Sequence, residues 1–230
     1  MCKRLIFFFL LTNVYYVNAQ IVIDNSAPYN NPTWLVDNML LGGGVIANNH
    51  TYQGATAQIG WFNAENTSLG LDSGIILCTG DIYSVDPISP GFGVIMPVPG
   101  VVDADLLTVA NSVPPLIGQT FTVSSVNDVA ILEFDFVPTS DSISFRYVFG
   151  SEEYFAYENT AFNDVFGFFL SGPGINGPYA NGAINLAVIP NSSPELPVTI
   201  SSVNAVTPIN QQYFVDNTAG TDTIASADGL

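Results

Sequence analysis

The stretches Ala130-Ile-Leu-Glu-Phe-Asp-Phe-Val137 and Ile143-Ser-Phe-Arg-Tyr-Val-Phe149 decide the fold class of this chain. In both of them, apolar and polar side chains alternate with a period of two, which is the pattern of a strand with one buried face. The segment between them, Pro138-Thr-Ser-Asp141, has the composition of a turn. The two stretches therefore predict an antiparallel hairpin whose aromatic side chains face inward.

The rest of the chain has the same character, with short apolar segments separated by Gly, Pro and Asn. Further strands are predicted over residues 45–63, 74–79, 165–170, 184–189 and 197–203. Short helices are predicted over residues 32–41, with Asn31 as cap and Pro32 in the first position, and over residues 103–111. We therefore expect a mainly β protein, an antiparallel β-sandwich of the jelly-roll type with one or two short helices.

The first nineteen residues have the three parts of a secretory signal peptide. Lys3 and Arg4 form a basic start, residues 5–11 are an unbroken apolar run, and Ala19 provides a small residue for cleavage. The apolar run is shorter than the roughly 20 residues that a membrane-spanning helix needs. A buried N-terminal strand is the alternative. We expect cleavage after Ala19, a secreted or cell-surface location, and no membrane insertion after cleavage.

Beyond the signal peptide, the sequence predicts a short leader segment followed by one folded domain. Residues 20–32 contain Pro28 and Pro32 and are predicted to be a leader segment. Residues 33–230 are long enough for one β domain with a buried core. The 48% content of hydrophobic residues argues against disorder, even though the chain carries a high net charge.

The charge balance excludes several classes of partner and chemistry. The chain has 20 acidic and three basic residues, for a formal net charge of −17, and Arg146 is the only basic residue beyond the predicted signal peptide. Such a surface repels nucleic acid and anionic membranes, because phosphate contacts need Lys and Arg. One His and one Cys beyond residue 19 cannot build an ordinary zinc site.

Arg146 has two interpretations. A four-residue turn in the predicted hairpin places Val137 opposite Ser142, and this register places Glu133 opposite the arginine. The role that we predict is therefore a structural, cross-strand ion pair between Glu133 and Arg146. The alternative is a binding site for an anion or a carboxylate ligand.

A candidate metal site follows the second strand of the hairpin. Calcium takes about six to eight oxygen ligands from carboxylates, amides and carbonyls, on a loop that can fold round the ion. The candidate calcium ligands are Glu152, Glu153, Glu158, Asn163 and Asp164. Their spacing matches no EF-hand loop, so the alternative is that these side chains are solvated or cap nearby backbone amides.

The residues favour binding over catalysis. Glu152 and Glu153 are neighbours, so on a strand they point apart and cannot flank one glycosidic bond. No lysine lies beyond residue 19, which excludes Schiff-base chemistry. We expect a non-enzymatic, exported domain that binds an extracellular glycan, protein or matrix ligand. The alternatives are a secreted carboxylate-dependent hydrolase acting on polysaccharide, and a purely structural spacer module.

Three segments resemble the signature of the choice-of-anchor L domain family. They are Leu132-Glu-Phe-Asp-Phe-Val-Pro138, Phe149-Gly-Ser-Glu-Glu-Tyr154 and Phe162-Asn-Asp-Val-Phe-Gly-Phe-Phe-Leu-Ser-Gly-Pro-Gly174. The resemblance covers roughly residues 33–230. It implies an exported bacterial surface protein, often from Bacteroidota, and it assigns no catalytic residues.

The resemblance also implies that the domain is incomplete at its C-terminus. The family continues past an Asp-Gly segment, which Asp228-Gly229 matches, into more strands. Longer relatives carry C-terminal sorting or anchoring signals, which this sequence does not show. We therefore expect a sheet that lacks its last strands and has an unpaired edge.

Overall fold

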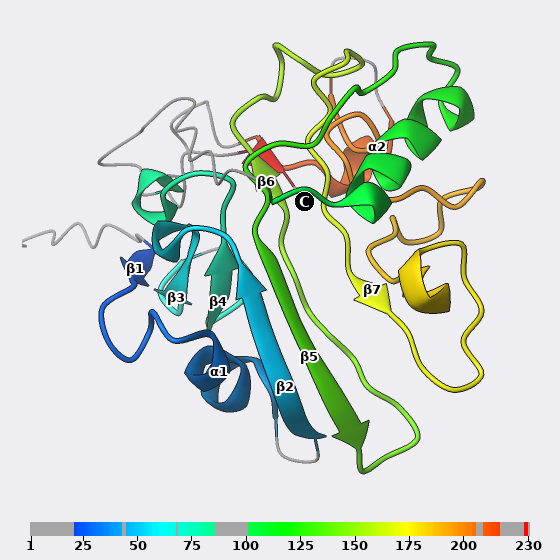
Figure 1. Ribbon diagram of the computed structural model, residues 1–230. Helices are drawn as coiled ribbons and strands as arrows, with labels where there is room; N and C mark the ends of the chain where they lie inside the picture. Colours follow the sequence, from blue (N-terminus) through cyan, green and yellow to red (C-terminus); the bar gives the residue numbers. More distant parts are fainter. Residues whose placement is uncertain are drawn as a thin grey trace, which may run out of the picture.

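The computed structural model describes residues 21–42, 45–67, 69–85, 101–205, 209–216 and 228–229. The predicted signal peptide, residues 1–19, lies outside them. In the described part of the chain, the strands pair only in antiparallel fashion, alongside two α-helices (Figure 1). The predicted mainly β, antiparallel class is therefore confirmed.

The described strands belong to four small sheets. The largest contains β1 (Val22–Asp24), β3 (Ile59–Asn63) and β4 (Ser73–Leu77), in the order β1-β3-β4. The paired strands are β2 (Val45–Gln53) with β5 (Ile131–Pro138), β6 (Gly150–Ser151) with β9 (Asp228–Gly229), and β7 (Phe169–Leu170) with β8 (Ile184–Asn185). Short 3-10 helices are η2 (Thr56–Gln58), η3 (Ile82–Val85), η4 (Ala180–Gly182) and η5 (Gln211–Tyr213).

The beginning of the described chain is part of the β1-β3-β4 sheet. The sequence predicts a leader over residues 20–32, but β1 pairs along its length with β3. Ile21 is 6% exposed and packs with Phe62 and Ala64 in a small core. Residues 22–24 of the predicted leader therefore form a strand of this sheet, and the apolar side chain of Ile21 contributes to its core.

The first helix begins where the sequence predicts. Pro32 is the first residue of α1 (Pro32–Leu35), and the side chain of Asn31 accepts a 3.1 Å hydrogen bond from the backbone N–H of Trp34. A π-helical turn, η1 (Val36–Leu40), continues the helix. The structure therefore confirms the predicted helix and its cap.

The second helix is longer than predicted. It is α2 (Ala104–Leu116), and the side chain of Asp103 caps it by accepting a 2.8 Å hydrogen bond from the backbone N–H of Leu106. The sequence predicts an end at residue 111, before Pro114 and Pro115. The helix nevertheless includes both prolines. Val109, Ala110 and Val113 are fully buried on one face of it, and this burial keeps the last turn in the protein interior.

The longest strand pair is the ribbon of β2 and β5, which crosses the centre of Figure 1. The sequence predicts that β5 pairs with residues 143–149. The chain does turn back after β5, but in the described residues no β-bridge joins β5 to that segment. The partner prediction is wrong, because alternation determines which side chains face inward and does not determine which strand lies alongside.

The predicted inward faces are nevertheless largely confirmed. Glu133 and Asp135 are exposed, whereas their neighbours on β5 are partly buried. Tyr147 and Phe149 pack against the core cluster. The buried members of this cluster are Ala187, Ile189, Leu196, Val198 and Val203. The ring of Phe145 contacts Phe168 edge-on, with 4.6 Å between centroids.

Candidate functional site

Most of the predicted site residues lie in one loop. It runs from β6 to the residue before Val165, and we call residues 150–164 the acidic loop. Tyr154 is 5% exposed, and its ring packs edge-on against Phe214 with 4.9 Å between centroids. Val165 then forms an isolated bridge with Thr199. These contacts anchor the acidic loop to the core, so its polar side chains have defined positions.

Ser151 connects the two ends of the acidic loop. Its hydroxyl donates a hydrogen bond of 2.6 Å to Oδ2 of Asp164 and accepts one of 3.1 Å from the backbone N–H of Glu153. The hydroxyl therefore bonds the carboxylate of Asp164 and the backbone of Glu153, whose carboxylate also interacts with that of Asp164. Ser151 is not among the predicted site residues, although its position directly before the Glu152-Glu153 pair is the signal that could have identified it.

The carboxylates of the loop interact unfavourably with one another. Burial, with smaller contributions from the nearby carboxylates of Asp164 and Glu152, raises the pKa of Glu153 to about 7. Burial also raises the pKa of Asp164, while the hydrogen bond from Ser151 partly opposes this. Glu153 therefore exchanges its proton near neutral pH, which suits either a proton-transfer group or a cation ligand.

Asn163 connects the acidic loop to two other segments. It is 6% exposed, its Nδ2 donates a 3.1 Å hydrogen bond to the carbonyl of Ala110 on α2, and its Oδ1 accepts one of 3.3 Å from the backbone N–H of Ser201. Both ends of the side-chain amide are thus engaged within the protein. The sequence predicts a calcium ligand at this position, and the structure shows this side chain bonded to Ala110 and Ser201.

The acidic loop rests on a buried polar turn. Four polar side chains are fully buried there: Thr199, Ser201, Ser202 and Asn204. The hydroxyl of Ser201 accepts a 3.1 Å hydrogen bond from the backbone N–H of Asn159. The sequence predicts a strand over residues 197–203, but the structure has two isolated bridges followed by this turn. The turn supplies the polar partners that the loop needs in a buried place.

The remaining loop residues are only partly gathered. Glu152 is exposed, and Glu158 is 8% exposed. Oε2 of Glu153 and Oδ1 of Asn159 are buried without a hydrogen-bond partner. Within the described ranges, no group of three or more His, Cys, Asp or Glu side chains is assembled as for a bound metal ion. The structure thus brings Glu153 and Asp164 together and does not preassemble all five predicted ligands.

Two aromatic rings of the acidic loop face solvent. Phe162 is 63% exposed and Tyr157 is 44% exposed, and their rings pack edge-on with 5.4 Å between centroids. Thr160 holds the turn between them, since its hydroxyl donates a 2.6 Å hydrogen bond to the carbonyl of Tyr157 and accepts one of 3.2 Å from the N–H of Phe162. This pair is not among the predicted site residues, because strand periodicity does not extend into the loop.

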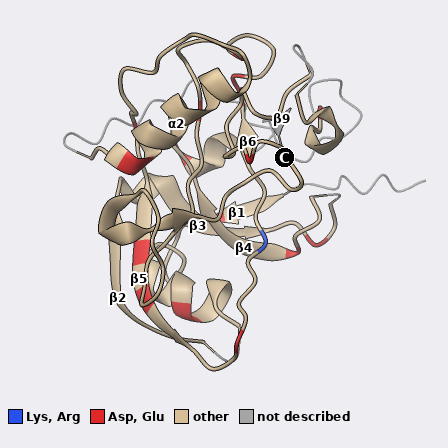
Figure 2. Ribbon diagram, turned by 90° about the vertical axis from the view of Figure 1, so that its right-hand side faces the viewer, with Lys and Arg blue, Asp and Glu red and all other residues tan. Residues whose placement is uncertain are grey.

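The predicted ion pair between Glu133 and Arg146 is not formed. Glu133 lies opposite Thr51 on β2 and accepts a 3.4 Å hydrogen bond from its hydroxyl. The guanidinium of Arg146 donates to the backbone carbonyl of Gly70. The predicted register is wrong because β5 pairs with β2. Figure 2 shows the basic position near β4, while acidic positions are spread over the molecule.

The comparisons with known proteins give one match. A family model described as the choice-of-anchor L domain matches residues 22–229, from β1 to β9. No curated protein and no solved structure matches the chain. Among the helices that the structure describes, none has the length and apolar character required to cross a membrane.

Proposed function

Because this chain belongs to the choice-of-anchor L domain family, we propose that it is an exported, non-enzymatic surface module that binds a glycan, protein or matrix ligand outside the cell. In this proposal the acidic loop is the binding surface. The observation that carries it is the exposed aromatic pair of Tyr157 and Phe162, which shares a loop with the carboxylates of Glu152 and Glu153.

The chemistry of the loop suits a ligand with one apolar face and several hydrogen-bonding groups. Aromatic rings offer a large apolar contact area at little cost in side-chain entropy, and they are enriched where proteins bind partners. Carboxylates accept hydrogen bonds from hydroxyl or amide groups. A sugar ring combines an apolar face with hydroxyl groups at its edge, so a glycan is the ligand that we favour.

We further propose that calcium binds at the acidic loop through Glu152, Glu153 and Asp164, with Oδ1 of Asn159. The raised pKa values of Glu153 and Asp164 support this, because a divalent cation removes the repulsion between carboxylates. The buried oxygens of Glu153 and Asn159 also lack hydrogen-bond partners. Because Glu152 is exposed, the loop has to close round the ion for this residue to contribute.

A glycan array with the full chain tests the binding proposal, in calcium and in chelator. We expect Phe162→Ser to abolish binding without changing the melting temperature, because the ring is mostly in water. Ile46→Ser is the matched control, since Ile46 is 64% exposed on the β2–β5 ribbon, outside the acidic loop. Equal binding by Phe162→Ser and the unmodified chain would contradict the proposed surface.

One observation favours the hydrolase alternative, namely the pKa of Glu153 near 7. A carboxylic acid with this pKa can donate a proton at neutral pH, as a glycosidase acid does. A screen of polysaccharide hydrolysis separates the two functions. Turnover that disappears in Glu153→Gln supports a hydrolase, whereas glycan binding without turnover supports the surface module.

A further inference from the structure

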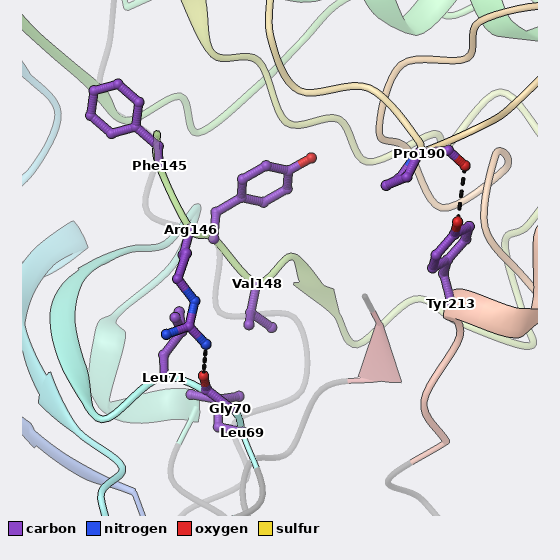
Figure 3. Close-up of a pocket in the computed structure, with 9 residues that line it drawn as sticks. Leu69, Gly70, Leu71, Phe145, Arg146, Val148, Pro190 and Tyr213 are labelled. Atoms are coloured by element: carbon purple, nitrogen blue, oxygen red, sulfur yellow. Dashed lines mark hydrogen bonds between the residues drawn. The ribbon is translucent and has the colours of Figure 1, made fainter. Parts of the chain in front are cut away.

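A hollow of about 400 Å³ lies between the turn before β4 and the segment that follows the β5 turn (Figure 3). Most of the side chains that line it are apolar. They include Leu69, Leu71, Val148, Pro190 and Tyr213, with Arg146 at the side of residues 69–71. Its volume lies at the lower end of the range of sites for small organic ligands. The hollow shares no residue with the acidic loop.

Arg146 is the only Lys or Arg among the described residues. It is exposed, and its Nη2 donates to the carbonyl of Gly70. Within the described ranges no carboxylate lies within ion-pairing distance of the guanidinium, although the chain has 20 acidic residues. A guanidinium has five N–H donors, so several remain for a ligand after the bond to Gly70.

We propose that this hollow binds a small organic monocarboxylate whose body is an apolar ring or chain. The guanidinium can donate two parallel hydrogen bonds to one carboxylate and attracts its negative charge. A neutral ligand lacks this charge attraction. Leu71 and Val148 offer apolar contact to the rest of the ligand. The hydroxyl of Tyr213 donates a 3.0 Å hydrogen bond to the carbonyl of Pro190, which braces the opposite wall.

The charge of the protein limits the ligand to a single negative charge. At a formal net charge of −17, the surface repels anions, and the repulsion grows with each charge on the ligand. One arginine compensates one carboxylate and leaves a second or third uncompensated. We therefore expect selection against di- and tricarboxylates and against phosphate.

Ligand-observed NMR and calorimetry with the full chain test this proposal, with benzoate as the probe. We expect a dissociation constant on the order of millimolar for a ligand of this size, and at least about tenfold weaker binding of the neutral isostere benzamide. Citrate and inorganic phosphate, at the same ionic strength, are expected to bind at least about tenfold more weakly than benzoate. Equal affinity for benzoate and benzamide would overturn the proposal.

Variants of Arg146 and Val148 assign the site. Arg146→Gln should weaken benzoate binding about tenfold, and Arg146→Lys should recover part of it, because an ammonium is a cation without the guanidinium fork. Loss of the bond to Gly70 could also disturb the fold, so a second pair of variants leaves Arg146 in place. Val148 is 42% exposed, which allows Val148→Asp and Val148→Asn to fold normally.

The Val148 pair gives the decisive comparison. Val148→Asp supplies an internal carboxylate beside the guanidinium and should abolish benzoate binding, whereas its isostere Val148→Asn should retain most of it. The same benzoate affinity in both variants would overturn the proposal. Glycan binding at the acidic loop is expected to be unchanged in all of these variants, so failure here and failure of the proposed function are distinguishable.

Discussion

The side-chain amide of Asn163 donates a 3.1 Å hydrogen bond to the backbone carbonyl of Ala110, which is the helical carbonyl that Pro114 leaves without a donor. In an α-helix the N–H of a residue bonds to the carbonyl four residues earlier, and proline has no N–H. The acidic loop therefore supplies the donor that α2 lacks. This bond connects the candidate site directly to the helix beneath it.

Replacing Asn163 by Ala should destabilise the protein by about 2–4 kcal/mol, because the buried carbonyl of Ala110 and the buried N–H of Ser201 both lose their partners. In a Pro114→Ala background the cost should fall by about 1 kcal/mol, because residue 114 then donates to Ala110 itself. Urea unfolding of the four proteins in this double-mutant cycle measures the difference.

Pro115→Ala is the control for this cycle. Pro115→Ala restores an N–H donor for the backbone carbonyl of Asn111, and not for that of Ala110. Its effect on the free energy of unfolding should therefore add to that of Asn163→Ala within about 0.5 kcal/mol. The assignment is wrong if the Pro114 cycle is equally additive, since the amide of Asn163 would then not replace the missing helical donor.

Glu153 should make the stability of the protein depend on pH. The folded-state pKa is about 7, against an ordinary value of 4.5, so the folded protein binds more protons than the unfolded chain between these values. Stability should therefore fall as the pH rises through this window, and level off above it. Glu153→Gln should reduce this slope and be more stable than the unmodified chain above pH 7.

Urea midpoints measured at several pH values in chelator test this expectation. Asp164 adds a slope of the same sign, because its pKa is also raised, so some dependence should remain in Glu153→Gln. Glu65→Gln is the matched control, since Glu65 is exposed. An unchanged slope in Glu153→Gln would place the pH dependence elsewhere in the molecule.

Local patterns predicted local structure well. The Asn31-Pro32 pair marks the beginning of α1, because both residues act within one turn of the chain. Alternation along β5 identifies its inward face for the same reason. The strand partner could not be predicted in this way, since β2 lies far earlier in the sequence and residues 143–149 carry the same alternation. The choice between them depends on tertiary packing.

The candidate site was predicted by composition and corrected by geometry. Residue type alone indicated that Glu153 and Asp164 belong to an acidic site, and the structure brings their carboxylates close enough to interact. It could not indicate that the amide of Asn163 is engaged by a helix carbonyl while that of Asn159 retains a buried, unpartnered oxygen. Both amides lie in the same loop, and only their partners distinguish them.

Gln58 should be among the most sensitive polar positions of the fold. It is fully buried, its Oε1 accepts a 2.7 Å hydrogen bond from the N–H of Ala55, and its Nε2 donates to the carbonyls of Thr79 and Asp128 at 3.0 and 2.8 Å. Gln58→Leu removes all three bonds and should cost about 3 kcal/mol or more in urea unfolding.

The exposed Gln212 provides the control for Gln58. Gln212→Leu is expected to change the free energy of unfolding by no more than about 0.5 kcal/mol, because the side chain is exposed. Similar losses in the two variants would mean that the buried hydrogen bonds of Gln58 contribute little, and that the change in side-chain type is responsible.

Calcium should raise the melting temperature of the full chain relative to chelator, by an amount that increases with calcium concentration, because a ligand that binds only the folded state stabilises it. The rise should be larger at about pH 8 than at about pH 5, since protons compete with the ion for Glu153 below its raised pKa.

Glu153→Gln and Asp164→Asn should each remove most of the rise in melting temperature. Asp141→Asn, which removes an exposed carboxylate from the turn after β5, should retain it. Because Asp141→Asn and Asp164→Asn change the net charge equally, a rise that all three variants share would identify a diffuse effect of the acidic surface. A rise confined to chains with both Glu153 and Asp164 requires an ion held by these two side chains.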